Sequence, residues 1–246
     1  MALIVENIHF GYSSAIKILD NISFDVSFGK VFCVLGASGS GKSTLLRVIA
    51  GILPDNRNNC FSGDVKFNEL NISKIKLDGA LAFMFQEPTL MNNLTVKENI
   101  EFPFRLLNKI PQTPVEDTIR IVGLTDSMNK YPKELSGGMK TRTALARSFV
   151  TRPKLLLLDE PFSALDLGWR NTLHGELKTL QKRDNTTVVI VTHDIDEALE
   201  ISDKILILGH NGNVLQTYDV TSTNKSDIAI EAKKTIIEDH QISVAT

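Results

Sequence analysis

The chain has 246 residues, 42% hydrophobic and 23% charged, and its 27 basic and 29 acidic residues give a net charge of -2. This composition is typical of a globular protein with a buried core and excludes a disordered chain, while the balanced charge argues against general nucleic-acid binding, which needs a basic surface. The longest run without a charged residue, Ile205 to Tyr218, has 14 residues, whereas a membrane span needs about 20.

The N-terminal part predicts strands followed by one helix. Ile22 to Val26 alternates apolar and polar residues, as a half-buried antiparallel strand does. Val31 to Leu35 is a continuous apolar run, which favours a strand buried on both faces with Cys33 in the core. A helix is predicted from Lys42 to Ile49, and Gly51 provides its stop signal.

Three further apolar runs predict buried strands, and polar residues follow each of them. Ligands of open parallel sheets bind beyond the carboxyl ends of the strands, so these polar residues predict one site at one edge of the sheet. The runs are Leu81 to Phe85, Leu155 to Leu158 and Thr187 to Val191, and the polar residues are Gln86, Asp159-Glu160 and Thr192-His193.

The segment 88–152 is mainly helical in pattern, and prolines at 103, 111, 114 and 132 predict breaks in it. We interpret it as a helical subdomain inserted into the core. After it, the pattern predicts a helix over 196–201, a strand over 204–208, a hairpin at Gly212, a loop over 219–227 and a short terminal helix over 228–239.

Residues 36–43 fit the pattern GxxxxGK[ST], the glycine-rich loop that holds nucleotide phosphates. Glycines let backbone N–H groups approach phosphate oxygens, Lys42 supplies charge to the β- and γ-phosphates, and Ser43 supplies a hydroxyl to Mg²⁺. The following helix N-terminus favours an anion, and Thr44 belongs to it. The predicted nucleotide-binding residues are Gly36, Ala37, Ser38, Gly39, Ser40, Gly41, Lys42, Ser43 and Thr44. We call residues 36–43 the phosphate loop.

The acidic pair after the leucine run predicts the second half of the site. Asp159 would hold Mg²⁺ through water, and Glu160 would orient or deprotonate the attacking water. Two acids after a strand more often form a capped strand end, and the upstream phosphate loop is what favours the functional interpretation.

Leu135-Ser136-Gly137-Gly138-Met139, which we call the signature, precedes a predicted helix through Phe149. Ser136 is a good N-cap, and the two glycines expose N–H groups of the first turn. From these residues alone, a second phosphate cradle and an ordinary capped helix fit equally well.

Together these motifs resemble the ATP-binding subunits of ABC transporters over most of the chain. The matching pieces occur in the family order: the phosphate loop, Gln86, the signature, Leu155 to Glu160, Ser163-Ala164-Leu165-Asp166 and His193. The resemblance implies an α/β fold: a P-loop NTPase core with an N-terminal antiparallel β-subdomain and an inserted α-helical subdomain. It implies one ABC ATPase domain over 1–246, with the core at about 1–86 and 153–246 and the helical subdomain at 87–152.

The resemblance also implies a role for each matching position. Tyr12 would stack on adenine, although a core tyrosine is the alternative. Gln86 would sense Mg²⁺ and the attacking water, and His193 would contact the γ-phosphate. The signature would grip the γ-phosphate held by the other subunit, and Asp166 would lie in the loop that crosses between subunits. The implied catalytic residues are Glu160, His193 and Gln86, and the implied magnesium ligands are Ser43, Gln86 and Asp159.

The implied function is ATP binding and hydrolysis that powers solute transport, with two chains facing head to tail around ATP and docked on permease subunits at the cytoplasmic face of the membrane. The cofactors are ATP and Mg²⁺, the partner cassette is a second copy, and no nucleic acid is expected. Segments such as Pro161 to Asp166 and Thr192 to Ala198 resemble bacterial importers of the nitrate, sulfonate and taurine branch, which implies a periplasmic or lipid-anchored solute-binding protein.

Two features leave alternatives open. Asn92-Asn93 stands where that branch has Pro-Trp, and the stretch 54–63 is longer than the family norm. The ATPase of an exporter or lipid-extraction system would share every catalytic motif. A soluble ABC ATPase of DNA repair or translation fits less well, because those proteins usually have two cassettes or a long coiled-coil insertion.

Overall fold

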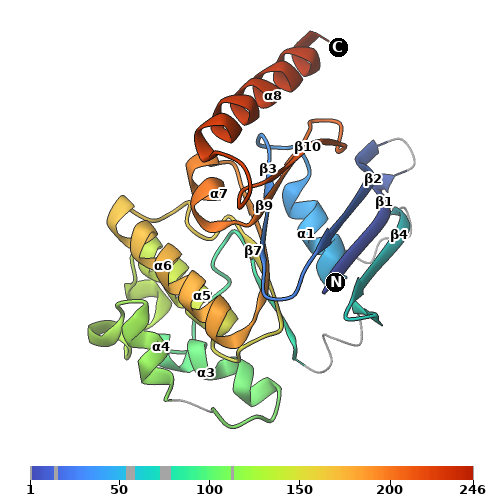
Figure 1. Cartoon of the computed structure of the whole chain (residues 1–246). Helices are drawn as coiled ribbons and strands as arrows, with labels where there is room; N and C mark the ends of the chain where they lie inside the picture. The colour runs from blue at the N-terminus through green and yellow to red at the C-terminus, as the bar shows by residue number, and fades with distance from the viewer. Residues whose placement is uncertain (1, 14–15, 54–58, 73–78, 112–113, 246) are drawn as a thin grey trace. The chain divides into compact units, whose positions relative to one another are not determined.

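The computed structural model describes residues 2–13, 16–53, 59–72, 79–111 and 114–245, and it confirms a mixed α/β fold (Figure 1). The chain divides into two compact units: Met1–Ile75 with Thr187–Thr246, and Lys76–Thr186. This division differs from the predicted helical subdomain at 87–152, whose bounds stay a prediction. Within the described residues, no helix is long and apolar enough to cross a membrane.

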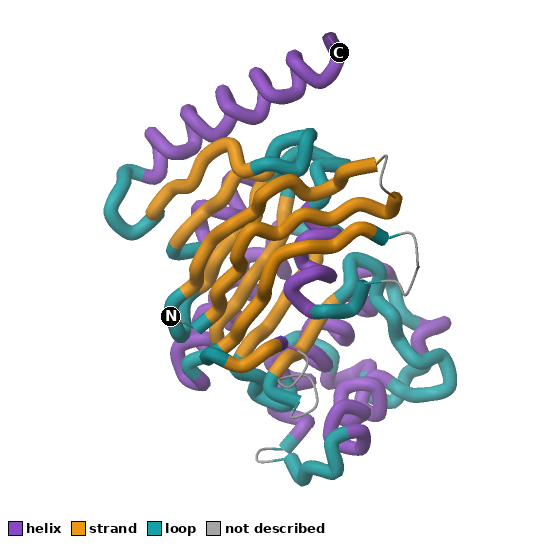
Figure 2. Tube along the Cα trace, turned by 90° about the vertical axis from the view of Figure 1, so that its right-hand side faces the viewer, coloured by secondary structure: helices purple, strands orange, loops and turns teal. Residues whose placement is uncertain are grey.

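The first unit contains an antiparallel sheet in the order β2-β1-β4-β5, part of the orange strands in Figure 2. The predicted strand Ile22 to Val26 is the end of β2, and Phe24 pairs with Val5 of β1. Side chains on one face of this sheet are buried and those on the other are exposed, which is why the sequence alternates. The strands are β1 (Leu3–Ser13), β2 (Ile16–Val26), β4 (Cys60–Phe67) and β5 (Leu70–Asn71).

The same unit contains strands in the order β10-β9-β3-β8, and the burial of β3, β8 and most of β9 confirms the predicted apolar runs. β3 pairs in parallel with both β8 and β9, and every residue of β3 is buried. Cys33 lies in this core, where burial and the nearby Glu197 carboxylate raise the pKa of its thiol well above the ordinary value, so it stays a neutral packing residue. The strands are β3 (Val31–Leu35), β8 (Thr187–Thr192), β9 (Lys204–Leu208) and β10 (Val214–Asp219).

The helices whose bounds the structure describes in this unit are α1 (Lys42–Ala50), α7 (Ile195–Ile201) and α8 (Lys225–Ala245). Gly51 ends α1 at φ 58°, in the left-handed region that glycine tolerates. Gly212, at φ 68°, forms the predicted turn between β9 and β10. Asp194 starts α7 by accepting hydrogen bonds from the N–H groups of Asp196 and Glu197.

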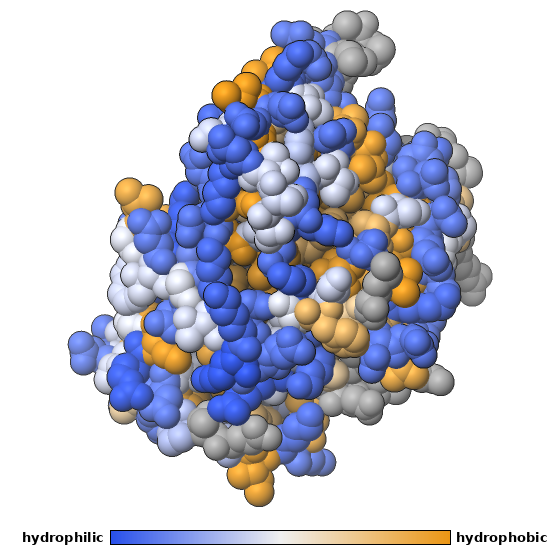
Figure 3. Space-filling view, viewed as in Figure 1, coloured by the Kyte–Doolittle hydropathy of each residue, from blue (hydrophilic) through white to orange (hydrophobic). Residues whose placement is uncertain are grey.

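The terminal helix α8 is longer than predicted, and the predicted loop over 219–227 is correspondingly shorter. Asn224 starts the helix early because its side chain accepts a hydrogen bond from the Ser226 N–H at 3.1 Å. Ile228 and Ala232, four residues apart, are buried. The face of the helix seen in Figure 3 is mostly hydrophilic, while Ile230 and Ile237 are exposed apolar residues of this helix.

The second unit pairs β6 (Leu81–Met84) with β7 (Leu155–Asp159) in parallel. Leu155 to Leu158 are buried, as predicted, and Asp159 at the end of β7 is buried as well. The prediction that Leu81 to Phe85 forms a buried strand is wrong as to burial, because the first three residues of β6 are half-buried and Phe85 is exposed. The reason is that side chains of β6 line an open groove, described below.

Helices make up most of the second unit: α3 (Val96–Leu106), α4 (Val115–Ile121), α5 (Gly137–Phe149), α6 (Leu167–Asp184) and the 3-10 turns η1 (Thr125–Ser127) and η2 (Pro132–Glu134). The prediction that Pro103 breaks the helical pattern is wrong, since it lies inside α3. Proline costs α3 one hydrogen bond near its end, and a reciprocal capping box of Thr95 and Glu98 stabilises its start.

Candidate nucleotide-binding site

The phosphate loop connects β3 to α1 in the first unit. Lys42 is almost fully buried, and its Nζ donates hydrogen bonds to the carbonyl oxygens of Gly36 at 2.9 Å and Ala37 at 2.7 Å. These bonds hold the ammonium group over the loop. Gly41, at φ 95°, precedes the helix without a capping side chain, which leaves room for an anion where the dipole of α1 favours negative charge.

Gly36 is required by a close approach of two backbones. A Cβ added at Gly36 would lie 2.5 Å from the carbonyl oxygen of Leu208, at the end of β9. A backbone atom held in a sheet cannot yield, so any side chain at this position would displace the phosphate loop.

We expect Gly36→Ala to weaken nucleotide binding at least tenfold and to lower the free energy of unfolding by about 1–3 kcal/mol, the usual cost of overpacking. Nucleotide titration and urea denaturation measure the two effects. Gly175→Ala in α6 is the matched control, since a Cβ there meets nothing within 4 Å and should stabilise the helix by about 0.5–1 kcal/mol. Normal affinity in Gly36→Ala would contradict this account of the loop.

Two other predicted residues lie in the first unit. Tyr12, at the end of β1, is 36% exposed, and its ring packs edge-on against the ring of Phe10 with 5.0 Å between the ring centroids. It is therefore not a core tyrosine, and its ring is accessible to a base. His193 is exposed between β8 and α7. Their roles toward a nucleotide stay predictions.

The second unit brings Gln86 and Glu160 together. Nε2 of Gln86 donates a hydrogen bond to Oε2 of Glu160 at 3.3 Å. Glu160 has φ 45°, a left-handed conformation that a non-glycine residue adopts at a cost. Asp159, the last residue of β7, is fully buried. At the end of β7, the Asp159 carboxylate is therefore buried in the core, and the carboxylate of the next residue, Glu160, accepts a hydrogen bond from the Gln86 amide.

Ser163 holds the strained residue in place, a role that motif reasoning did not assign to it. Its hydroxyl donates a hydrogen bond to the carbonyl oxygen of Glu160 at 3.0 Å. The sequence did mark this residue, because Ser163 is the first residue of the family motif Ser163 to Asp166, here called the dimer loop. Asp166 ends the dimer loop and caps α6, accepting a hydrogen bond from the Trp169 N–H at 3.0 Å.

The signature lies at the start of α5, as predicted. Ser136 is the N-cap and accepts a hydrogen bond from the Met139 N–H at 3.3 Å. Leu135 is buried, while Ser136 and Gly137 are exposed. A Cβ at Gly137 would meet nothing within 4 Å, so the first turn of α5 has space in front of it. An anion can therefore approach the first turn of α5.

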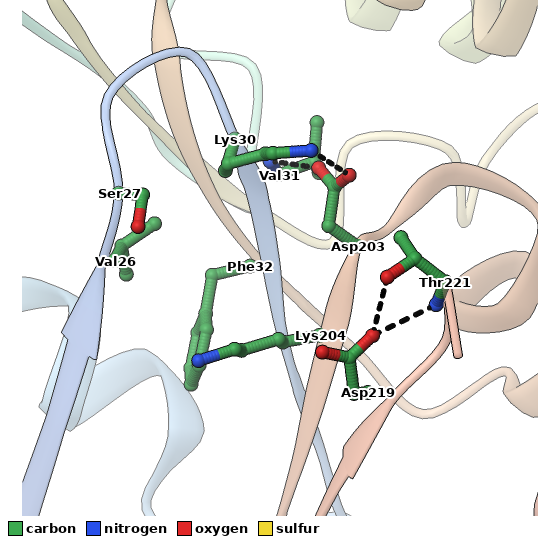
Figure 4. A pocket seen from close by; sticks show the side chains of 9 residues that line it. All are labelled: Val26, Ser27, Lys30, Val31, Phe32, Asp203, Lys204, Asp219 and Thr221. Carbon is green, nitrogen blue, oxygen red and sulfur yellow. Dashed lines mark hydrogen bonds and ion pairs between the residues drawn. The ribbon is translucent and has the colours of Figure 1, made fainter. Parts of the chain in front are cut away.

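Two pockets lie outside these motifs. The first, of ≈ 90 Å³, lies where β3 and β9 begin. Three of its charged side chains bind neighbours within the pocket: Lys30 pairs with Asp203 at 2.9 Å, and Asp219 accepts hydrogen bonds from Thr221 (Figure 4). The second is a groove of ≈ 520 Å³ in the second unit. Its apolar lining includes Phe83 of β6, Met91 before α3, and Phe102 and Leu106 of α3, and Arg147 near the end of α5 adds a basic side chain.

The phosphate loop between a buried strand and a helix places the chain in the class of P-loop nucleotide-binding proteins. The family model described as "ABC transporter" matches residues 19–163. The chain therefore belongs to the ABC transporter family, as one of its ATP-binding cassettes, which are ATP hydrolases.

Curated relatives are import cassettes. The chain is 43% identical over 192 residues to an aliphatic sulfonates import ATP-binding protein, SsuB 2, of Pseudomonas syringae pv. tomato, covering 78% of this chain and 76% of the relative. It is 37% identical over 227 residues to a sulfate/thiosulfate import ATP-binding protein, CysA, of Neisseria meningitidis serogroup B. That match covers 88% of this chain but only 61% of the relative, so the chain spans less than two thirds of that protein's length.

Solved structures confirm the fold class. The dimeric post-hydrolysis state of the ATP-binding cassette MJ0796, bound to ADP and Pi, has a TM-score of 0.78 at 28% identity, covering 89% of this chain and 98% of that chain. The cassette cbiO1 of Clostridium perfringens, part of the transporter complex cbiONQ, has a TM-score of 0.75 at 28% identity, covering 96% of this chain and 93% of that one.

Proposed function

We propose that this chain is the ATP-hydrolysing subunit of an importer for a small oxyanion, working as a head-to-tail homodimer docked on a permease at the cytoplasmic face of the membrane. The observation that carries the proposal is the presence of both halves of an ATP site, a phosphate loop and a signature. The solute class rests on the sulfonate and sulfate relatives. A periplasmic or lipid-anchored binding protein would deliver the solute.

In this proposal the phosphate loop and Lys42 bind the phosphates of ATP, and Tyr12 stacks on its base. Ser43 and Asp159 would hold Mg²⁺, which prefers oxygen ligands, and Gln86 would add its amide oxygen, since its nitrogen is engaged with Glu160. When bound, the metal would supply positive charge against the phosphates. Glu160 orients and deprotonates the attacking water, and catalysis is mainly positioning and charge stabilisation.

The remaining residues complete the site in the dimer. His193 contacts the γ-phosphate from its own subunit, while the signature, Leu135 to Met139, grips the γ-phosphate held by the partner. Both contacts depend on the γ-phosphate, so ATP favours the closed dimer and hydrolysis reopens it. Asp166 belongs to the dimer loop that crosses to the partner.

The apolar groove of the second unit is the proposed permease-docking surface. Its wall includes β6, whose last residue, Met84, lies two positions before Gln86. An amphipathic permease segment seated there would press on the strand that leads to the catalytic amide. Leu106, at 69% exposure, lies on the groove and is open to such a partner.

We expect Leu106→Asp to abolish stimulation of ATP hydrolysis by the permease while leaving the basal rate of the isolated chain unchanged, because a charge in an apolar interface must be desolvated. Ile110→Asp is the matched control, since Ile110 is 88% exposed and does not line the groove. The measurement is ATPase activity of the chain reconstituted in proteoliposomes with its permease partner. Equal stimulation of both variants would place docking elsewhere.

An exporter or lipid-extraction ATPase remains the alternative function, with a soluble ATPase of DNA repair or translation less favoured. The same proteoliposomes separate them. Stimulation by binding protein loaded with sulfonate, sulfate, taurine or nitrate supports import. Stimulation by lipid alone supports extraction, and co-purification with nucleic acid or ribosomes supports a soluble role.

A further inference from the structure

The start of α5 contacts the segment 163–169 at two levels, one helical turn apart. At the first level, a Cβ on Gly138 would be 3.5 Å from the carbonyl oxygen of Ala164 and 3.6 Å from the side chain of Leu165. At the second level, the guanidinium carbon of Arg142 lies 3.9 Å from the centroid of the Trp169 ring. Because positions i and i+4 share one face of a helix, a single face of α5 rests on the dimer loop and the first turn of α6.

Arg142 is held firmly against this ring. It is 8% exposed, and its NH1 donates hydrogen bonds to the carbonyl oxygens of Val122 at 2.8 Å and Gly123 at 3.1 Å. Asp166 adds an attractive charge. A guanidinium fixed by two carbonyls cannot follow the ring if the ring moves, so the stacking geometry restrains the indole.

The backbone at Gly123 is a second neighbour of the indole. This residue has φ 62°, and a Cβ there would lie 1.9 Å from the Trp169 ring. Only glycine leaves room for the ring beside that backbone. Trp169 is thus confined between Arg142 and Gly123, and its own backbone N–H donates to the Asp166 carboxylate at 3.0 Å.

We propose that Trp169 is a positioning residue that locks the signature to the dimer loop, so that both move as one block within each subunit. The proposal rests on the proposed function. In the proposed dimer the signature reaches the partner's ATP, and Asp166 crosses the interface. When the signature closes on the partner's ATP, the dimer loop moves with it toward the other ATP site. The two ATP sites of the dimer are thereby coupled.

The lock predicts a specific kinetic change in Trp169→Leu, which keeps apolar bulk but removes the aromatic face. We expect kcat to fall roughly tenfold, the order expected for losing a desolvated cation–π contact at a positioning residue. The Hill coefficient for ATP should fall toward 1, whereas the KM for ATP should stay within about twofold because the phosphate loop is untouched. Trp169→Phe, which restores an aromatic face for Arg142, should recover most of both quantities.

The experiment measures steady-state ATP hydrolysis by the full chain at varied ATP, with thermal denaturation of each variant to show that it folds. Phe28→Leu is the control, since Phe28 is a 47% exposed aromatic outside the motifs, and it should behave as wild type. Wild-type kcat and Hill coefficient in folded Trp169→Leu would overturn the lock, as would a Phe variant no better than the Leu variant. Lack of hydrolysis by the wild type would instead refute the proposed function.

Discussion

Replacing Glu160 by glutamine leaves ATP binding intact and slows hydrolysis by about 10²–10⁴-fold, the contribution expected of a general base. Glutamine keeps the size of the side chain and its place at φ 45°, so the strained turn after β7 is preserved. It cannot accept a proton from water. Binding and chemistry should therefore separate, and ATP-bound dimers should accumulate. Single-turnover hydrolysis and size-exclusion chromatography with ATP measure the two effects.

The contact with Gln86 makes this prediction sharper. In the wild type, the amide nitrogen of Gln86 donates to Oε2 of Glu160, and in the Glu160→Gln variant the new side chain offers a carbonyl oxygen to the same donor. The variant side chain thus keeps its hydrogen bond to Gln86 and its position. The loss of hydrolysis that remains therefore reports on proton transfer from the attacking water. Glu238→Gln, an exposed carboxylate on α8, is the control for a lost surface charge. Unchanged turnover in Glu160→Gln would show that another group activates the water.

The sequence was most informative where strands lie in the middle of a sheet. Val31 to Leu35, Leu155 to Leu158 and Thr187 to Val191 are continuous apolar runs because both faces are covered, and the structure buries all of them. The same rule overstated the burial of Leu81 to Phe85, since composition does not reveal that one side of a strand lines a groove.

The helix α6 could not be predicted from its pattern. It contains Gly168 and Gly175, which lower helix propensity, and its buried face includes His174 and Gln181 beside leucines. Polar residues on the inner face erase the periodicity that marks an amphipathic helix. Tertiary packing, including the edge-on contact of His174 with Phe162 at 4.6 Å, offsets the weak local preference.

The site divides in the same way. Motif spacing located the phosphate loop, the signature and the acidic pair, because phosphate binding demands particular residues at fixed separations. The stacking of Arg142 on Trp169 has no such local signature, since it joins α5 to α6 and needs a glycine on a third segment at position 123. Contacts between distant segments are set by packing, and they become visible only in the folded chain.

Replacing Lys42 by alanine weakens ATP binding by about 10–150-fold, the effect of losing a hydrogen bond to a charged group worth roughly 1.5–3 kcal/mol. The ammonium already lies over the loop, held by the carbonyl oxygens of Gly36 and Ala37, so the wild type spends little ordering energy when phosphate arrives. Alanine removes both the charge and this preorganisation. Nucleotide titration by fluorescence or calorimetry gives the dissociation constant directly.

The Glu160→Gln background is the right place to measure this effect, because slow turnover lets affinity be read without hydrolysis. Lys66→Ala is the matched control, since Lys66 forms an exposed ion pair with Asp64 at 2.7 Å and surface pairs contribute little. An interaction with ground-state ATP raises the dissociation constant when removed, whereas one made only in the transition state lowers kcat alone. Unchanged affinity with reduced kcat in Lys42→Ala would therefore move Lys42 from nucleotide binding to transition-state stabilisation.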